Sequence, residues 1–177
     1  DVEEDTFTID VSTLESLITK KTVAIVPVHL YGQSADLQPI AEFARKYSLH
    51  VIEDAAQSLG AEYRWADGTA RKVGTIGTIG TTSFFPTKIL GAFGDGGALL
   101  TQDHDLAVNL RMIANHGQSK KYQHDVIGPN TRLDTLQAAI LLTKLKYIEL
   151  YTSRRQAVAD YYDSRLRNIS FLKIPAR

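Results

Sequence analysis

The fold is decided by residues 23–52, which read VAIVPVHLYGQSADLQPIAEFARKYSLHVI. The stretch opens with Val23–Val28, a continuous apolar run rich in β-branched residues, which is typical of a strand buried on both faces. Asp36 then precedes Leu37–Tyr47, where apolar residues recur at helical spacing, and Leu49–Ile52 is a second strand-length run. Strand, helix and strand in this order predict a right-handed crossover between parallel strands.

Elements of the same kind lie on either side of this stretch. Asp10 can cap a short helix through Val11–Thr19. Gly60–Val73 contains the turn signal Asp67-Gly68 and predicts a hairpin, after which Ile79–Phe85 returns to the sheet.

Two further elements complete the sheet and its cover. Gly97–Thr101 predicts another strand, and a helix capped by Asp103 or Asp105 is expected to run through Ala114. The pattern predicts an α/β fold, with a mostly parallel sheet covered by helices.

The C-terminal third is expected to differ in character. Gly117–Asn130 is polar and shows no periodicity, which predicts a long loop of a kind that is more often functional or mobile than decorative. Leu133–Leu166 predicts helix with a break near Tyr151–Ser153. We expect residues 1–147 to form a large domain whose N-terminal part is missing, and residues 148–177 to lead toward a second, smaller domain.

Composition limits the possible functions. The 20 Lys and Arg residues balance the 20 Asp and Glu residues, which argues against nucleic-acid or anionic-membrane binding. The absence of cysteine excludes disulfides and thiolate metal sites, and no metal is expected. Short apolar runs and an acidic start favour the cytoplasm. A start without Met, and an end soon after a helical stretch, favour an excerpt from a longer protein.

Two ionisable residues follow predicted strands closely. Lys88 comes just after an apolar strand and before Gly91, where a desolvated amine can act as a nucleophile, although most lysines are solvated surface groups. Asp54 follows a strand end, the place where open α/β sheets bind ligands, although it could instead cap the next turn. Glu53 and Asp54 side by side are costly after a buried strand unless a cation lies nearby.

Several motifs occur together and in order. They are Pro27–Gln33, Glu53–Ser58, Ser83–Lys88, Gly94–Gly97, Asn115–Gly117 and Asn130–Ala139. In this order and spacing the chain resembles the DegT/DnrJ/EryC1/StrS family of sugar aminotransferases, over nearly its whole length. The resemblance implies a three-layer α/β/α fold of the fold-type I pyridoxal-phosphate class, with the start of a C-terminal helical connection, and a homodimer with shared active sites.

The resemblance also implies roles for individual residues. Lys88 would hold pyridoxal 5'-phosphate covalently, and Asp54 would pair with its pyridine nitrogen. Gln57 would lie near the cofactor ring, and Ser83 would contact the phosphate, although an ordinary strand serine is the alternative. Asn130 would reach the phosphate of the neighbouring subunit's cofactor.

Three further residues are candidates for the substrate site. They are His29, His116 and Arg132, of which the arginine would also help to shape its loop. For both histidines a structural reading is equally open, and His29 in particular could be a hydrogen-bonded residue at a strand end.

The activity that the resemblance implies is transamination. An amino group would pass from an amino-acid donor, glutamate, to a keto group of a nucleotide-linked sugar during the synthesis of cell-surface polysaccharide, lipopolysaccharide or related glycoconjugates. Dehydratase relatives have histidine at the position of Lys88, so the lysine favours transamination. The family's phosphate loop and ring-stacking residue are not found before Val23.

Two other classes of protein are alternatives. A nicotinamide-dependent oxidoreductase needs the spacing G-x-G-x-x-G, whereas Gly74–Gly80 has G-x-x-G-x-x-G and no helical pattern follows. A non-catalytic or regulatory relative of the same fold, or a pyridoxal-phosphate-dependent sugar dehydratase, is the remaining alternative, and the presence of Asp54, Gln57 and Lys88 together favours an active transaminase.

Overall fold

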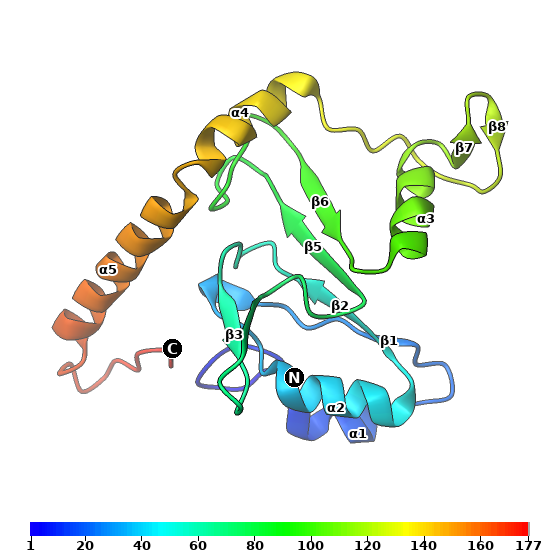
Figure 1. Ribbon diagram of the computed structural model, residues 1–177. Helices are drawn as coiled ribbons and strands as arrows, with labels where there is room; N and C mark the ends of the chain where they lie inside the picture. The colour runs from blue at the N-terminus through cyan, green and yellow to red at the C-terminus, as the bar shows by residue number, and fades with distance from the viewer. Residues whose placement is uncertain (177) are drawn as a thin grey trace.

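The structure is a computed structural model that describes residues 1–176, so Arg177, the last residue of the predicted segment 148–177, lies outside the described residues. Its centre is a four-stranded sheet with the order β1-β2-β5-β6 (Figure 1). The strands are β1 (Ala24–Ile25), β2 (His50–Asp54), β5 (Ile79–Ser83) and β6 (Gly97–Leu100). β1, β2 and β5 are parallel and β6 is antiparallel to β5, which confirms the predicted α/β class and mostly parallel sheet.

The predicted crossover is present. Helix α2 (Leu37–Tyr47) has the predicted bounds and joins β1 to β2. Its apolar side packs on the sheet, and the shared core consists of Leu14, Ile25, Ala35, Leu37, Ile40, Ala44 and Val51. Each large aliphatic side chain buried in this way contributes on the order of 2 kcal/mol, and this core therefore anchors β2.

The start of the chain packs on the same side as α2. The predicted helix is shorter than expected and splits into a 3-10 turn (Val11–Thr13) and α1 (Leu14–Leu17), which lies beside α2 in Figure 1. The cap is as predicted, because the Asp10 side chain accepts the Ser12 N–H at 2.9 Å.

The prediction that Val23–Val28 is buried on both faces is wrong for the described chain. Ile25 is 7% exposed, but Val26 and Val28 on the other face are 54% and 39% exposed, and Val23, just before β1, is 69% exposed. The reason is that α2 packs on the face of β1 that carries Ile25, and it buries that face in a core shared with Leu37, Ile40 and Ala44.

The hairpin prediction is confirmed. β3 (Glu62–Arg64) pairs antiparallel with β4 (Ala70–Lys72). Gly68 has φ +87°, and the Asp67 side chain accepts the Thr69 N–H at 2.8 Å, so the Asp-Gly turn is closed by the residues that predicted it.

Regular structure interrupts the expected loop Gly117–Asn130. After α3 (His104–Ala114), which Asp103 caps through the Leu106 N–H at 3.0 Å, the chain forms the short hairpin β7 (Gln118–Lys120) and β8 (Gln123–His124). Both strands are polar and largely exposed, so they have no apolar alternation from which a sequence could reveal them.

The C-terminal helices are α4 (Thr135–Leu145) and α5 (Ile148–Leu166), and the predicted break at Tyr151–Ser153 is wrong. The break falls at Lys146–Tyr147 instead. The helix continues through Ser153 because the Ser153 hydroxyl donates to the Leu150 carbonyl at 3.1 Å and is accommodated inside the helix.

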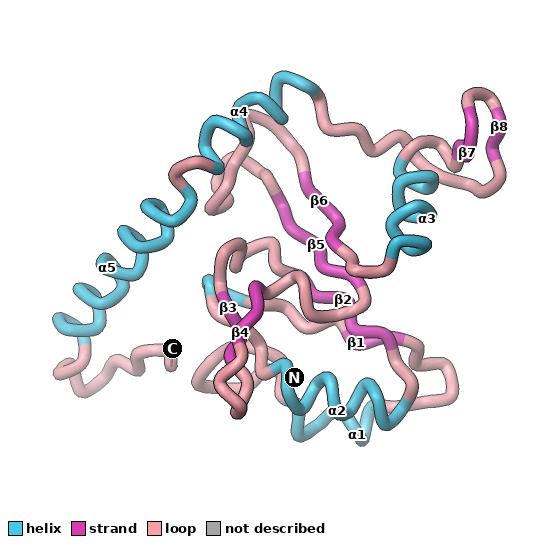
Figure 2. Tube along the Cα trace, viewed as in Figure 1, coloured by secondary structure: helices cyan, strands magenta, loops and turns pink. Residues whose placement is uncertain are grey.

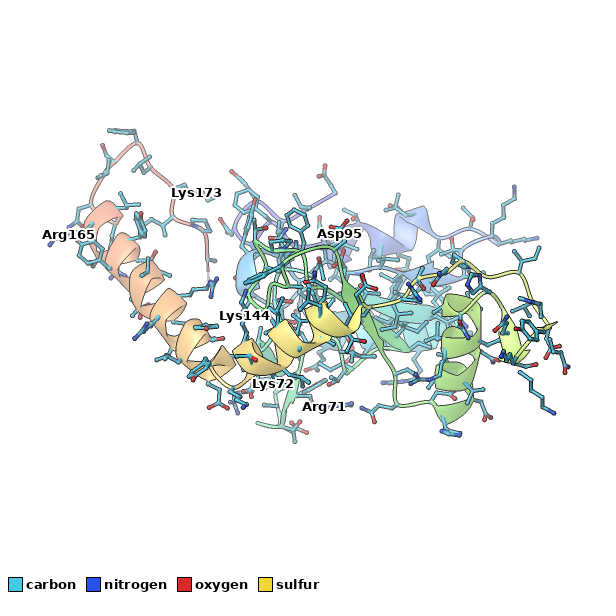
Figure 3. All side chains as sticks on the ribbon, turned by 90° about the horizontal axis from the view of Figure 1, so that it is seen from above. Arg71, Lys72, Asp95, Lys144, Arg165 and Lys173 are labelled. Atoms are coloured by element: carbon cyan, nitrogen blue, oxygen red, sulfur yellow. The ribbon has the colours of Figure 1, made fainter. Side chains whose placement is uncertain are left out.

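Helix α5 runs away from the sheet, and the chain then turns back toward the N-terminus (Figure 2). The Lys173 ammonium, marked in Figure 3, lies 3.3 Å from Glu4 and 2.7 Å from Asp5. These exposed ion pairs contribute little stability. Within residues 1–176, no helix has both the length and the apolar character that crossing a bilayer requires.

Candidate active site

Four of the predicted site residues follow two neighbouring strands. β2 and β5 are parallel, and their register pairs Asp54 with Thr81, so both strands have their carboxyl ends at the same edge of the sheet. Asp54 ends β2 and Gln57 follows it, while Ser83 ends β5 and Lys88 lies five residues further on. Asp54 and Ser83 therefore lie at the edge of the sheet where α/β folds hold ligands, and Gln57 and Lys88 lie on the segments that leave this edge.

The backbone of Asp54 is fixed from both sides. Its carbonyl accepts the His29 N–H at 2.9 Å, and its own N–H donates to the Pro27 carbonyl at 2.9 Å. On the β5 side, the following Ala55 N–H donates to the Thr81 carbonyl at 2.8 Å. The strand end that carries the carboxylate is thus held in place by β5 and by the chain that continues β1.

The half-buried side chain of Asp54 acts as a cap through one oxygen only. Oδ1 accepts the Ala56 N–H at 3.0 Å, and this is the single side-chain hydrogen bond of Asp54 within residues 1–176. Oδ2 therefore remains able to accept a hydrogen bond from a ligand that approaches the strand end. The capping and ligand-binding readings of Asp54 are compatible with each other.

The neighbouring acid, Glu53, needs no bound cation, which corrects the expectation from the sequence. Strand alternation places its side chain on the opposite face from Asp54, where it is 0% exposed. Oε2 accepts from the His29 Nε2 at 3.0 Å and from the Gly74 N–H at 2.7 Å. Oε1 accepts from the Ile76 N–H at 2.7 Å and from the Gly77 N–H at 2.6 Å.

These contacts decide the protonation state of Glu53. Burial by itself raises the pKa of this carboxyl, but the hydrogen bond from His29 and those from three backbone N–H groups outweigh it and lower the pKa below its ordinary value. Glu53 is therefore an ionised carboxylate inside the protein, neutralised by oriented donors and not by a cation.

The segment Gly74–Gly80, which resembles a dinucleotide fingerprint only loosely, holds this carboxylate. A Cβ added at Gly77 would lie 2.6 Å from the Val51 carbonyl oxygen, and one added at Gly80 would lie 1.8 Å from that of Gly74. The glycines let the loop fold back onto β2 and β5 closely enough for its N–H groups to reach Glu53. An acid followed by a glycine-rich stretch is the signal that could have identified this pairing.

His29 lies inside the same network and is also 0% exposed. Its Nδ1 accepts the Ala35 N–H at 3.0 Å, so the ring proton must reside on Nε2, which donates to Glu53. Both ring nitrogens are occupied, and these contacts favour the structural reading of His29 over a substrate-binding one.

Lys88 lies on a closed loop after β5. Its N–H donates to the Phe85 carbonyl at 2.9 Å, and a Cβ at Gly91 would lie 2.3 Å from the Pro86 carbonyl oxygen. Helix α4 secures the loop, because Lys144 Nζ, labelled in Figure 3, donates to the Gly91 carbonyl at 2.6 Å. The half-buried Lys88 ammonium has no hydrogen-bond or ion-pair partner within residues 1–176, so its amine is open to a ligand.

Ser83 and Gln57 are placed less tightly. The Ser83 hydroxyl accepts the Phe85 N–H at 3.3 Å, and the exposed Gln57 side chain accepts the Tyr31 N–H at 3.4 Å. Tyr31 has φ +56°, a strained conformation for a bulky residue, at the turn that faces Gln57. Both polar groups can still bind a ligand through their remaining hydrogen-bonding capacity.

His116, Asn130 and Arg132 lie elsewhere, beside the C-terminal end of α3 and along the segment that leads to α4 (Figure 1). Asn130 forms an isolated antiparallel bridge with Asn115, and the His116 N–H donates to the Pro129 carbonyl at 2.8 Å. Arg132 and Asp134 form an exposed ion pair at 3.9 Å. Within residues 1–176, no hydrogen bond or ion pair joins this group to the strand-end residues.

The arrangement at the strand ends suits a particular chemistry. An amine without a partner can condense with an aldehyde, and a carboxylate with one oxygen available can hold a protonated nitrogen. A hydroxyl and backbone N–H groups near a strand end can bind an anion.

Comparison with known proteins agrees with this picture. The model of the DegT/DnrJ/EryC1/StrS aminotransferase family matches residues 1–176. A UDP-2-acetamido-2-deoxy-3-oxo-D-glucuronate aminotransferase from Pseudomonas aeruginosa is 48% identical over 169 residues, which cover 96% of this chain and 46% of that protein. A pleiotropic regulatory protein from Geobacillus stearothermophilus is 49% identical over 162 residues, which cover 92% of this chain and 42% of that protein.

Solved structures agree as well. NtdA from Bacillus subtilis, crystallised with bound cofactor PMP, is 35% identical and superposes with a TM-score of 0.86 over 99% of this chain and 40% of its own. The chain therefore spans less than half the length of each of these three proteins.

Proposed function

This chain belongs to the DegT/DnrJ/EryC1/StrS aminotransferase family, and from that premise we propose that it forms the cofactor-binding part of a nucleotide-sugar aminotransferase. The proposed reaction transfers an amino group from glutamate to a keto group of a nucleotide-linked sugar, in the synthesis of a cell-surface polysaccharide or a related glycoconjugate. The name of the Pseudomonas relative, a UDP-sugar aminotransferase, supports this substrate class.

One observation carries the proposal. Asp54 and Lys88 follow adjacent parallel strands at the same edge of the sheet, the first with a carboxylate oxygen available and the second with a partnerless amine. A cofactor with a ring nitrogen at one end and an aldehyde on the ring could engage both at once.

These residues fit pyridoxal 5'-phosphate, and the PMP-bound NtdA structure supports that choice. When bound, this cofactor draws electron density away from the carbon that exchanges the amino group. Asp54 would keep the ring nitrogen protonated through Oδ2. Lys88 would hold the cofactor through its amine and, once replaced by the substrate amine, would carry the proton that moves at the substrate carbon. Ser83 would bind the phosphate and Gln57 would lie beside the ring.

The proposal extends to assembly. Asn130 is exposed, it bridges to Asn115 just beyond α3, and within residues 1–176 it has no hydrogen bond to the strand-end residues, as expected of a residue that completes the partner subunit's phosphate site. His116 and Arg132 lie on the two segments that the bridge between Asn115 and Asn130 joins, and they would support it. We further assign residues 1–147 to the cofactor domain and residues 148–177 to the connection toward a second domain, with the boundary just before α5.

The test uses the full-length protein and its absorbance spectrum. A bound-cofactor band that changes when glutamate is added, and that returns when a keto-sugar nucleotide follows, is the expected result. Borohydride reduction and peptide mapping should then find the cofactor on Lys88. Lys72, an exposed lysine paired with Glu62 at 3.0 Å, serves as the control. Label on Lys72, or no cofactor band at all, contradicts the proposal.

A regulatory role is the second candidate, because the Geobacillus relative is named a pleiotropic regulatory protein. The same experiment separates the two. A regulatory protein of this fold could bind the cofactor at Lys88, but its spectrum would not complete the cycle when a keto-sugar nucleotide is supplied.

A further inference from the structure

The buried carboxylate of Glu53 joins three segments directly behind Asp54. It lies on β2 and receives hydrogen bonds from His29, which continues β1, and from the loop Gly74–Gly77, which precedes β5. These segments are far apart in sequence, and one side chain holds them together.

His29 and β5, the strand into which the glycine loop leads, also reach the backbone around Asp54. His29 binds Glu53 through its ring and the Asp54 carbonyl through its backbone N–H at 2.9 Å. On the other side, the Thr81 hydroxyl donates to the Glu53 carbonyl at 3.1 Å, while the Thr81 carbonyl accepts the Ala55 N–H at 2.8 Å. A shift of His29 or of β5 would therefore displace the backbone on which the Asp54 carboxylate is mounted.

We propose that Glu53 is a positioning residue for the cofactor, which fixes the Asp54 carboxylate toward the ring nitrogen from the opposite face of the sheet. The inference rests on the proposed function, and it assigns a role to a residue that does not itself touch the cofactor.

A carboxylate is needed at this position because of the number of donors. Glu53 faces four N–H groups, and a carboxylate has enough lone pairs to accept from all of them. Glutamine has one acceptor oxygen, and its NH₂ group would point at two of the donors. Glu53→Gln should therefore keep the volume of the side chain while loosening His29 or the glycine loop.

The test is a double-mutant cycle in the full-length protein, with pyridoxal 5'-phosphate as the ligand. Glu53→Gln should weaken cofactor binding about tenfold, Asp54→Asn should weaken it as well, and the double variant should be within about twofold of Asp54→Asn alone, because Glu53 acts through Asp54. Glu62→Gln, which removes an exposed carboxylate, is the matched control and should bind like the wild type.

A second readout separates positioning from general stability. The pH dependence of the bound-cofactor absorbance should move in Glu53→Gln, since protonation of the ring nitrogen depends on the Asp54 carboxylate, and it should stay unchanged in Glu62→Gln. If Glu53→Gln lowers cofactor affinity equally in the wild type and in Asp54→Asn, or leaves the pH profile of the absorbance unchanged, the positioning role of Glu53 is wrong while the proposed function still stands. A folded wild-type protein that binds no pyridoxal 5'-phosphate would overturn the proposed function as well.

If Glu53→Gln does not fold, His29→Asn takes its place. Asparagine can still accept the Ala35 N–H, but it is too short to donate to Glu53, which keeps three backbone donors. The same cycle with Asp54→Asn should again show loss of affinity only where Asp54 is present, and additive losses would count against the inference in the same way.

Discussion

Gly80→Ala is expected to destabilise the protein through the site of Glu53. Gly80 is buried in β5, and a Cβ at this position would lie 1.8 Å from the Gly74 carbonyl oxygen and 2.7 Å from the Gly74 Cα. Ordinary carbon–oxygen contact requires the Gly74 backbone to retreat by roughly 1.5 Å. The clash involves backbone on both sides, so no side-chain rotation can relieve it.

The structure gives the size of the effect. A retreat of that size stretches the 2.7 Å hydrogen bond from the Gly74 N–H to Glu53 beyond bonding distance. The loss of one hydrogen bond to a buried charge costs about 1.5–3 kcal/mol, and overpacking adds about 1–3 kcal/mol. Together these losses predict that the free energy of unfolding falls by roughly 2.5–6 kcal/mol.

Urea unfolding of the full-length protein measures the change. Gly94→Ala is the matched control, because a Cβ there meets only the flexible end of Gln137 at 3.3 Å, and it should remain within about 1 kcal/mol of the wild type. If Gly80→Ala is as stable as Gly94→Ala, the glycine loop does not pack against β5 as described and the reasoning fails.

Three further predictions concern the site. Asp54→Asn should leave the protein folded but slow the half-reaction with glutamate by about 2 kcal/mol or more of transition-state stabilisation, measured by stopped-flow absorbance; near-normal rates would refute its role. Mixing Lys88→Ala with Asn130→Ala subunits should restore activity in heterodimers, because one of the two shared sites then carries no defect; no recovery, although heterodimers form, places Asn130 outside the partner's site. Burial raises the pKa of Glu53, but its hydrogen bonds outweigh burial and leave the pKa of the folded protein below its ordinary value. The ionised carboxylate therefore stabilises the fold above the unfolded-state pKa of about 4.3, and this stabilisation is lost as pH falls through the folded pKa. The stability difference between wild type and Glu53→Gln should therefore shrink between about pH 6 and about pH 3, and a difference that grows over this range contradicts the assignment.

Local chemistry made some elements readable from the sequence. Helix α2 has the predicted bounds because its apolar residues recur with the helical period, and the β3–β4 turn closes on the Asp67-Gly68 pair that predicted it. Elements without such a local signal were missed. The β7–β8 hairpin has no buried face, and the helix break at Lys146–Tyr147 carries neither glycine nor proline.

Within the candidate site, too, some residues can be identified from the sequence and others cannot. Asp54 and Lys88 could be proposed from the sequence, because each follows an apolar strand and lies in a recognisable motif. Glu53 was misread, since an acid beside another acid looks costly until the donors that reach it are known. Those donors come from His29 and from the loop Gly74–Gly77, more than twenty residues away on either side.

Periodicity, turn residues and ordered motifs lie along the chain itself, so the α/β class, the crossover through α2 and the family could all be predicted before folding was considered. Three features needed the folded chain: the face of β2 that each acid occupies, the exposure of Val23 and Val26, and the hydrogen bonds that satisfy Glu53 without a cation. The physical reason is that burial and hydrogen-bond satisfaction depend on groups brought together by folding, whereas helical period and turn chemistry depend on neighbours in sequence.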